Sequence, residues 1–161
     1  MYKRQDQRLA ADEPTLASSY TALYSQISSA VVGITRSDYP RERSRSSITH
    51  FGTGTLLDPV GLVLTSPTVV PEGSRNIDVY LRGGRVAPAV LIKVYPGKEV
   101  SLLQLKDFRK ALPPGKSRLN YLRLGSSSTL SVGDPVFSLG NAFGSFTVSY
   151  TPRTLPAILI V

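Results

Sequence analysis

Residues 51–65 read FGTGTLLDPVGLVLT and carry the clearest local structural signal in the chain. Two short apolar runs, residues 51–57 and 62–65, flank the turn sequence Asp58-Pro59-Val60-Gly61. Proline and glycine supply the backbone angles that a tight turn needs, and short apolar runs joined by such a turn are typical of a β-hairpin. We therefore predict that residues 51–65 form two antiparallel strands.

The same alternation of short apolar runs and turns continues on both sides of this hairpin. Strands are predicted to start at Ala30, Phe51, Leu62, Asn76, Val86 and Val100. Six strands are enough to close a small Greek-key barrel, and closure leaves no strand edge exposed. Before them, residues 16–27 carry apolar side chains at helical spacing, which predicts one N-terminal amphipathic helix. The predicted fold class is therefore all-β.

The composition predicts four parts. Residues 1–15 are polar and are predicted to be disordered or artefactual, because MYKRQ at the start resembles translated adapter DNA of a metagenomic read. The true N-terminus is then expected to be missing. Residues 16–110 hold the helix and the first barrel, and residues 111–120 are a predicted linker. Residues 121–161 are the incomplete start of a second barrel, in which the predicted strands are residues 121–124 and 135–139.

The overall composition excludes several classes of chemistry. The chain has no cysteine, which rules out disulfides, thiolate metal sites and a cysteine nucleophile. No apolar run approaches the roughly 20 residues that a membrane-spanning helix needs. The net charge of +8 would attract nucleic acid, anionic lipid or acidic protein without selecting among them. We predict no cofactor and no metal site.

Two segments together resemble one protease family. Residues 51–65, and residues 124–144 with the sequence LGSSSTLSVGDPVFSLGNAFG, are similar in order and spacing to trypsin-like serine proteases of the HtrA/Deg type. The resemblance implies a chymotrypsin/trypsin-like Greek-key barrel followed by the start of a second one. It also implies a location in the bacterial periplasm or cell envelope. The alternative is that Gly-Thr-Gly and Val-Gly-Asp are ordinary β-turn sequences.

The resemblance further implies where catalytic residues would lie, and this chain departs from the family there. Residues 65–70 read TSPTVV where the family has Thr-Asn-x-His-Val-Val, so Thr68 stands in place of the catalytic histidine. A threonine hydroxyl does not ionise near neutral pH, and losing the imidazole base costs on the order of 10⁴- to 10⁶-fold in rate. Glu99 stands in place of the orienting aspartate, at the start of a run that matches the family's Asp-Leu-Ala-Val-Leu-Lys-Ile.

The remaining catalytic groups have no counterpart in the sequence. The single histidine, His50, is predicted to lie at a strand entry on the far side of the hairpin from position 68. The family's Gly-Asn-Ser-Gly-Gly segment, which bears the serine, does not occur, and residues 140–144 correspond to an earlier structural loop. We therefore predict that the chain as given has no protease activity.

Three functions follow from these observations. The first is a protease homologue, catalytically inactive, that binds or scaffolds a protein or peptide. The second is a fragment of an active serine endopeptidase. The third is a basic module that contacts nucleic acid or an acidic polymer through Arg36, Arg41, Arg43 and Arg45. A solvated loop is the simpler interpretation of these arginines, because no aromatic side chains interleave them to stack on bases.

Overall fold

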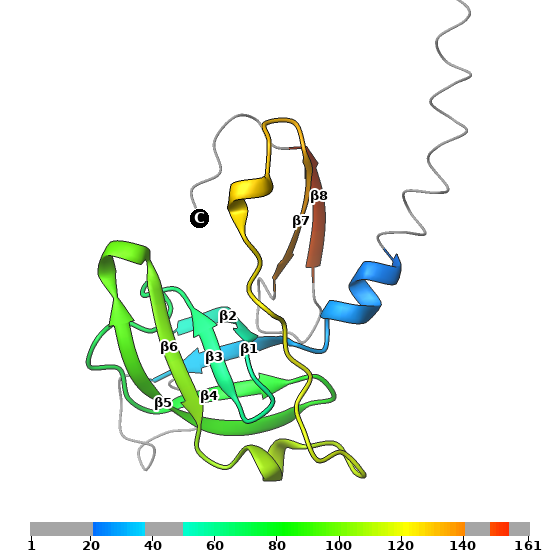
Figure 1. Ribbon diagram of the computed structural model, residues 1–161. Coiled ribbons are helices and arrows are strands. Elements are labelled where there is room, and N and C mark those ends of the chain that lie inside the picture. The colour runs from blue at the N-terminus through cyan, green and yellow to red at the C-terminus, as the bar shows by residue number, and fades with distance from the viewer. Residues whose placement is uncertain (1–20, 38–49, 141–148, 155–161) are drawn as a thin grey trace, which may run out of the picture.

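The computed structural model describes residues 21–37, 50–140 and 149–154 (Figure 1). Six antiparallel strands close into a barrel in the order β1-β2-β3-β6-β5-β4, and β7 pairs with β8 in a separate two-stranded sheet. The strands are β1 (Val31–Arg36), β2 (His50–Leu56), β3 (Leu62–Thr65), β4 (Ile77–Leu81), β5 (Arg85–Tyr95), β6 (Val100–Leu105), β7 (Pro135–Gly140) and β8 (Ser149–Thr154). The predicted all-β, six-stranded barrel is confirmed.

The predicted hairpin consists of β2 and β3, with Thr55 opposite Leu64. Asp58 fixes the turn between them, because its carboxylate accepts hydrogen bonds from the backbone N–H groups of Val60 at 2.9 Å and Leu62 at 2.8 Å. Gly61 follows with a φ of +99°, a backbone angle that residues with a Cβ rarely adopt. The turn chemistry read from the sequence therefore sets the register of this hairpin.

Alternation along the strands builds the core inside the barrel. In β4 and β6, every second residue is buried, so one face of each strand points inward. The largest fully buried apolar side chains are Val32, Ile34, Leu56, Val63, Val70, Ile77, Val79 and Leu103. Gly54 lets β2 approach this core closely, since a Cβ there would lie 2.7 Å from side-chain carbons of Ile34 and Val63.

Residues 21–27 are helical, as predicted, and residues 16–20 of the expected helix lie outside the described residues. Three turn residues, 28–30, connect the helix to β1, whose six residues are all buried. The buried Ser28 at this junction accepts a hydrogen bond of 2.8 Å from Arg82. In the part of the chain that the structure describes, no helix combines the length and apolar character needed to cross a bilayer.

The chain packs along the barrel after β6. A short 3-10 helix, Phe108–Ala111, is followed by an extended segment in which Ala111 and Leu119 belong to the barrel core. The N–H groups of Leu119 and Leu122 donate to the carbonyl oxygens of Pro59 and Leu56. The predicted strand at residues 121–124 is wrong, because this segment has no ladder partner and is irregular. The division into a first barrel, a linker and a second barrel stays a prediction.

Candidate functional site

Positions 68 and 99 lie at the same end of one strand pair. β3 and β6 run antiparallel, with Thr65, the last residue of β3, opposite Ser101. Thr68 follows β3 by three residues, and Glu99 directly precedes β6. The chain therefore leaves β3 and enters β6 at one rim of the barrel, which places both predicted site residues there (Figure 1).

Thr68 sits in a tight turn built on Ser66. The carbonyl oxygen of Ser66 accepts hydrogen bonds of 3.0 Å from the N–H groups of both Val69 and Val70. The Ser66 hydroxyl accepts from the Thr68 N–H at 3.2 Å and shares a second hydrogen bond, 2.8 Å long, with the Thr68 hydroxyl. The Thr68 side chain is exposed, and its hydroxyl is occupied locally. Two hydroxyl groups in contact offer no group that takes up a proton near neutral pH.

The turn is anchored to the barrel on two sides. Val70 is fully buried, and its carbonyl oxygen accepts a hydrogen bond of 2.7 Å from the buried hydroxyl of Ser101 on β6. Val69 packs against Gly52 of β2 so closely that a Cβ at position 52 would overlap its methyl groups. The backbone around Thr68 is therefore held in place although Thr68 itself faces solvent.

Glu99 has an unusual backbone and a solvent-exposed side chain. It follows the 3-10 helix Pro96–Lys98 with a φ of +54° and a ψ of 36°, the left-handed conformation, and its N–H donates to the Pro96 carbonyl oxygen at 3.2 Å. Within the described residues, the Glu99 carboxylate has no hydrogen-bond or ion-pair partner. A carboxylate in this setting is solvated rather than engaged with a neighbour.

His50 is a strand-entry histidine, as expected, but it lies at a different end of the hairpin from the one predicted. It is the first residue of β2, as a strand-entry histidine should be, and pairs with Arg36 of β1. The turn at residues 58–61 connects the last residue of β2 to the first residue of β3. His50, the first residue of β2, and Thr65, the last residue of β3, therefore both lie at the other end of the hairpin, and the Thr68 turn follows Thr65 there. The prediction that His50 lies on the far side of the hairpin from position 68 is therefore wrong.

The four arginines do not all lie in a loop. Arg36 is the last residue of β1, only 9% exposed, between His50 and Ile77 on the neighbouring strands, which corrects its assignment to a solvated loop. Arg41, Arg43 and Arg45 lie outside the described residues, and so do residues 141–144 of the expected structural loop. Contact of these arginines with an anionic partner stays a prediction. The described residues contain no cluster of three or more His, Cys, Asp or Glu side chains that could hold a metal ion.

Sequence reasoning did not single out Ser66 and Ser101. The only signal for Ser101 was a serine where the corresponding family run has alanine, at a position that alternation places on the inner face of β6. Nothing in the sequence indicated that its hydroxyl bonds to a carbonyl 31 residues away. For Ser66, the pattern Ser-Pro-Thr is compatible with a hydroxyl-capped turn, and this signal could have been used.

Comparison with known proteins places this barrel in a family. The profile of the trypsin-like peptidase domain matches residues 52–157, about two thirds of the chain. The chain belongs to the trypsin-like peptidase domain family. Its matched part therefore begins in β2, near the start of the hairpin, and runs beyond β8.

Curated relatives of this trypsin-like chain are of the DegP/HtrA type. A "Probable periplasmic serine endoprotease DegP-like" of Chlamydia pneumoniae is 34% identical over 104 residues, which cover 65% of this chain and 19% of the relative. A protein of the same name from Pseudomonas savastanoi is 34% identical over 122 residues, which cover 72% of this chain and 23% of the relative. The chain thus spans about a fifth of the length of these relatives, and its resemblance to HtrA-type proteases is confirmed.

Proposed function

We propose that this chain is an HtrA-type trypsin-like protease homologue that does not cut peptide bonds and acts by binding or scaffolding. The observation that carries the proposal is the hydroxyl pair of Ser66 and Thr68, 2.8 Å apart, at the position where the family resemblance implies a histidine base. Peptide hydrolysis by a serine hydroxyl needs a base that takes its proton. A pair of hydroxyl groups supplies no such base, so no group at this rim would accept the proton of a serine nucleophile.

The geometry of position 99 supports the same proposal. In a working triad the carboxylate is buried and hydrogen-bonded to the imidazole that it orients. The Glu99 side chain is exposed and has no partner among the described residues, and its extra methylene would displace an imidazole at position 68. Thr68 and Glu99, the two departures from the family pattern, lie at the same rim of the barrel. The turn and strands around them remain packed through the Val70–Ser101 hydrogen bond and the contact of Val69 with Gly52.

A protein or peptide is the partner class that we propose. The related proteins are named as endoproteases, which act on polypeptides, and loss of the base does not by itself remove a polypeptide-binding surface. Phe51, one residue before Gly52 on β2 and therefore on the opposite, outer face of that strand, is 53% exposed, which is high for a large apolar side chain. By the names of the relatives we further propose a periplasmic location.

The decisive experiment compares wild type with a restored base. The protein, in the length in which its gene encodes it, is assayed for casein hydrolysis and for labelling by a serine-directed fluorophosphonate. Wild type is expected to give neither. The double variant Thr68→His/Glu99→Asp rebuilds the two triad positions, and the single variant Glu99→Asp serves as its control. Hydrolysis and labelling by wild type would contradict the proposal and favour the second candidate, an active endopeptidase.

The nucleic-acid alternative has its own test. Arg36 is buried, which leaves three of the four arginines for such a contact. Binding of a fluorescent DNA duplex should weaken steeply between about 50 and 200 mM salt if phosphate contacts drive it. We expect no binding at the lower salt concentration; binding there with a steep salt slope would favour a basic module over a peptide-binding homologue.

A further inference from the structure

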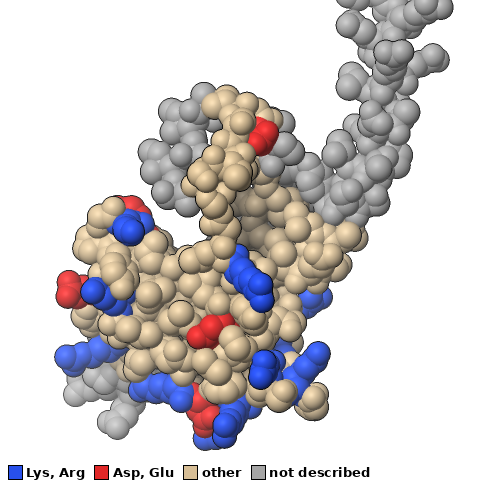
Figure 2. All heavy atoms as spheres, in the orientation of Figure 1, with Lys and Arg blue, Asp and Glu red and all other residues tan. Residues whose placement is uncertain are grey.

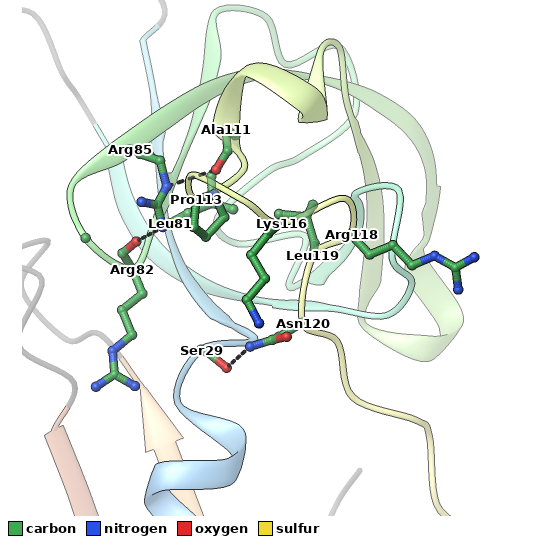
Figure 3. Close-up of a pocket in the computed structure, with 11 residues that line it drawn as sticks. Ser29, Leu81, Arg82, Arg85, Ala111, Pro113, Lys116, Arg118, Leu119 and Asn120 are labelled. Atoms are coloured by element: carbon green, nitrogen blue, oxygen red, sulfur yellow. Dashed lines mark hydrogen bonds between the residues drawn. The ribbon is translucent and has the colours of Figure 1, made fainter.

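A pocket of about 270 Å³ lies beside the turn between β4 and β5 (Figure 3). Its walls come from three places in the chain: the junction between the helix and β1, the turn between β4 and β5, and residues 111–120. The buried side chains of Leu81, Ala111 and Leu119 contribute apolar surface to it. The pocket is therefore formed by the segment after β6 packing against the barrel.

The pocket has a strongly basic lining. Arg82, Arg85, Lys116 and Arg118 all line it, and none of its lining residues is an aspartate or glutamate. Figure 2 shows many Lys and Arg side chains and fewer Asp and Glu side chains over the visible face of the molecule. Four cations around one apolar concavity create a positive potential that concentrates an anion there.

Hydrogen bonds hold two of these cations in place. Arg85 donates from Nε to the Ala111 carbonyl oxygen at 3.0 Å and from Nη2 to the Arg82 carbonyl oxygen at 2.7 Å. Arg82 in turn donates from Nη1 to the Ser28 hydroxyl at 2.8 Å. Fixing these side chains in the free protein lowers the entropy that ligand binding would otherwise cost.

Neutral polar groups complete the lining. The side-chain amide of Asn120 donates a hydrogen bond of 2.9 Å to the Ser29 hydroxyl, so the segment after β6 is tied to the start of β1. In Figure 3 the Lys116 side chain extends toward this pair, and the Arg118 side chain points away from it. A mobile ammonium group beside a fixed amide and hydroxyl is a suitable environment for a carboxylate or phosphate oxygen.

We propose that this pocket binds a small organic anion. The apolar group of the ligand packs on Leu81, Ala111 and Leu119, and its carboxylate or phosphate lies beside Lys116 and Asn120. The size of the ligand follows from the volume, because sites for drug-sized ligands occupy roughly 300–1,000 Å³ and this pocket is below that range. An apolar group comparable to one amino-acid side chain, together with the anionic head, fits this space.

This site is independent of the proposed function. Arg85 begins β5, whereas Tyr95, the last residue of β5, pairs with Val100 next to Glu99. The pocket and the Thr68 turn therefore lie toward opposite ends of β5. Variants at the pocket leave the Thr68 turn unchanged, and the two proposals can fail separately.

Each probe is titrated into the ¹⁵N-labelled 161-residue chain, and binding is monitored by chemical-shift changes in ¹H–¹⁵N NMR spectra. The probes are 4-methylpentanoate, its neutral twin 4-methylpentanamide, isobutyl phosphate and inorganic phosphate. We expect saturable shifts at Gly83, Leu119 and the Asn120 side-chain amide with one or both organic anions. The neutral amide should bind about tenfold more weakly, as expected when a charge-assisted hydrogen bond is lost.

Single variants locate the binding. Lys116→Gln removes the cation that extends toward Asn120 and should weaken binding of the organic anion by about fivefold or more. Arg118→Gln, whose side chain points away from Asn120, and Lys106→Gln and Arg123→Gln, which do not line the pocket, should each weaken it by less than about twofold. Backbone spectra that superimpose on wild type away from the substitution show that each variant is folded.

The relative affinities decide the outcome. Preference for the carboxylate, for the phosphate ester or for both over the neutral amide supports the proposal and identifies the head group. Equal affinity for 4-methylpentanamide would mean an apolar cavity without anion recognition and overturns it. If inorganic phosphate binds as tightly as the organic anions, or if the shifts do not saturate, the pocket attracts anions only through diffuse positive charge. Either result overturns the proposal.

Discussion

The buried hydroxyl of Ser101 donates a hydrogen bond of 2.7 Å to the carbonyl oxygen of Val70, 31 residues earlier in the chain. This bond joins the beginning of β6 to the end of the turn that bears Thr68. The Thr68 turn and the start of β6 carry the two positions implied for a base and its orienting carboxylate, and this hydrogen bond holds them together. Neither the Ser101 hydroxyl nor the Val70 carbonyl takes part in proton transfer. The rim keeps its shape without an imidazole.

Substitution of Ser101 should destabilise the barrel measurably. In Ser101→Ala the Val70 carbonyl oxygen loses its hydrogen bond within a fully buried environment, which costs about 1–3 kcal/mol of unfolding free energy. Urea denaturation followed by circular dichroism measures this loss. Ser117→Ala, at an exposed position, is the matched control and should lie within about 0.5 kcal/mol of wild type. Equal stability of the two variants would contradict the importance of the bond.

Gly52 should tolerate no side chain while Val69 is present. A Cβ at position 52 would overlap both methyl groups of Val69, and overpacking of this kind costs about 1–3 kcal/mol. The same substitution at Gly97, where no atom lies within 4 Å of the added Cβ, should cost much less. In a double-mutant cycle, Val69→Ala should recover part of the loss in Gly52→Ala. Strictly additive losses would show that the two residues do not compete for space.

Glu99 should be replaceable with a gain in stability. A left-handed backbone costs an ordinary residue about 1–2 kcal/mol, and asparagine enters this region more readily than glutamate. Since the Glu99 carboxylate has no partner among the described residues, Glu99→Asn is expected to stabilise the protein by about 0.5 kcal/mol. Thermal unfolding measures the change, and Lys98→Asn, one residue earlier in the 3-10 helix, provides the control without a gain. A loss in Glu99→Asn would reveal a stabilising role for the carboxylate.

Hydrogen exchange should show that the segment after β6 is part of the barrel. The amides of Leu119 and Leu122 donate to Pro59 and Leu56, and Leu119 is buried, so both amides should exchange slowly with the strands β1–β6. Amides of residues 125–133, which are exposed and form no strand, should exchange quickly. Fast exchange at Leu119 and Leu122 would instead favour a mobile linker starting soon after residue 110.

The sequence predicted the strands well because their signal is local. Alternation and turn residues placed all six starts at or next to the first residue of β1–β6. The failure at residues 121–124 has the same origin: the run is apolar, but Leu122 makes a single backbone bond to the barrel instead of joining a ladder. Tyr121 and Leu124 are 39% and 73% exposed, so local apolar character indicated neither burial nor strand pairing in this run.

The candidate site was only partly predictable. The resemblance to the protease family implied positions 68 and 99, and the antiparallel register of β3 and β6 brings them to one rim. The bond between Ser101 and Val70 and the position of His50 depend on how distant segments meet, which composition and periodicity do not encode. The pocket was missed because it forms only when residues 111–120, interpreted as a linker, pack back against the barrel.

The strand order has a consequence for synthesis on the ribosome. β3 gains its second neighbour only from β6, through pairs such as Leu62 with Gln104, and β1 gains its second neighbour from β4. At roughly 5–20 residues per second, the ribosome needs about 2–8 s to add the forty residues that follow β3 and complete β6. Both edges of the three-stranded unit β1–β3 are open until β4 is complete at Leu81, and the β3 edge stays open for the whole interval, which is when the nascent chain depends most on factors that shield emerging polypeptide.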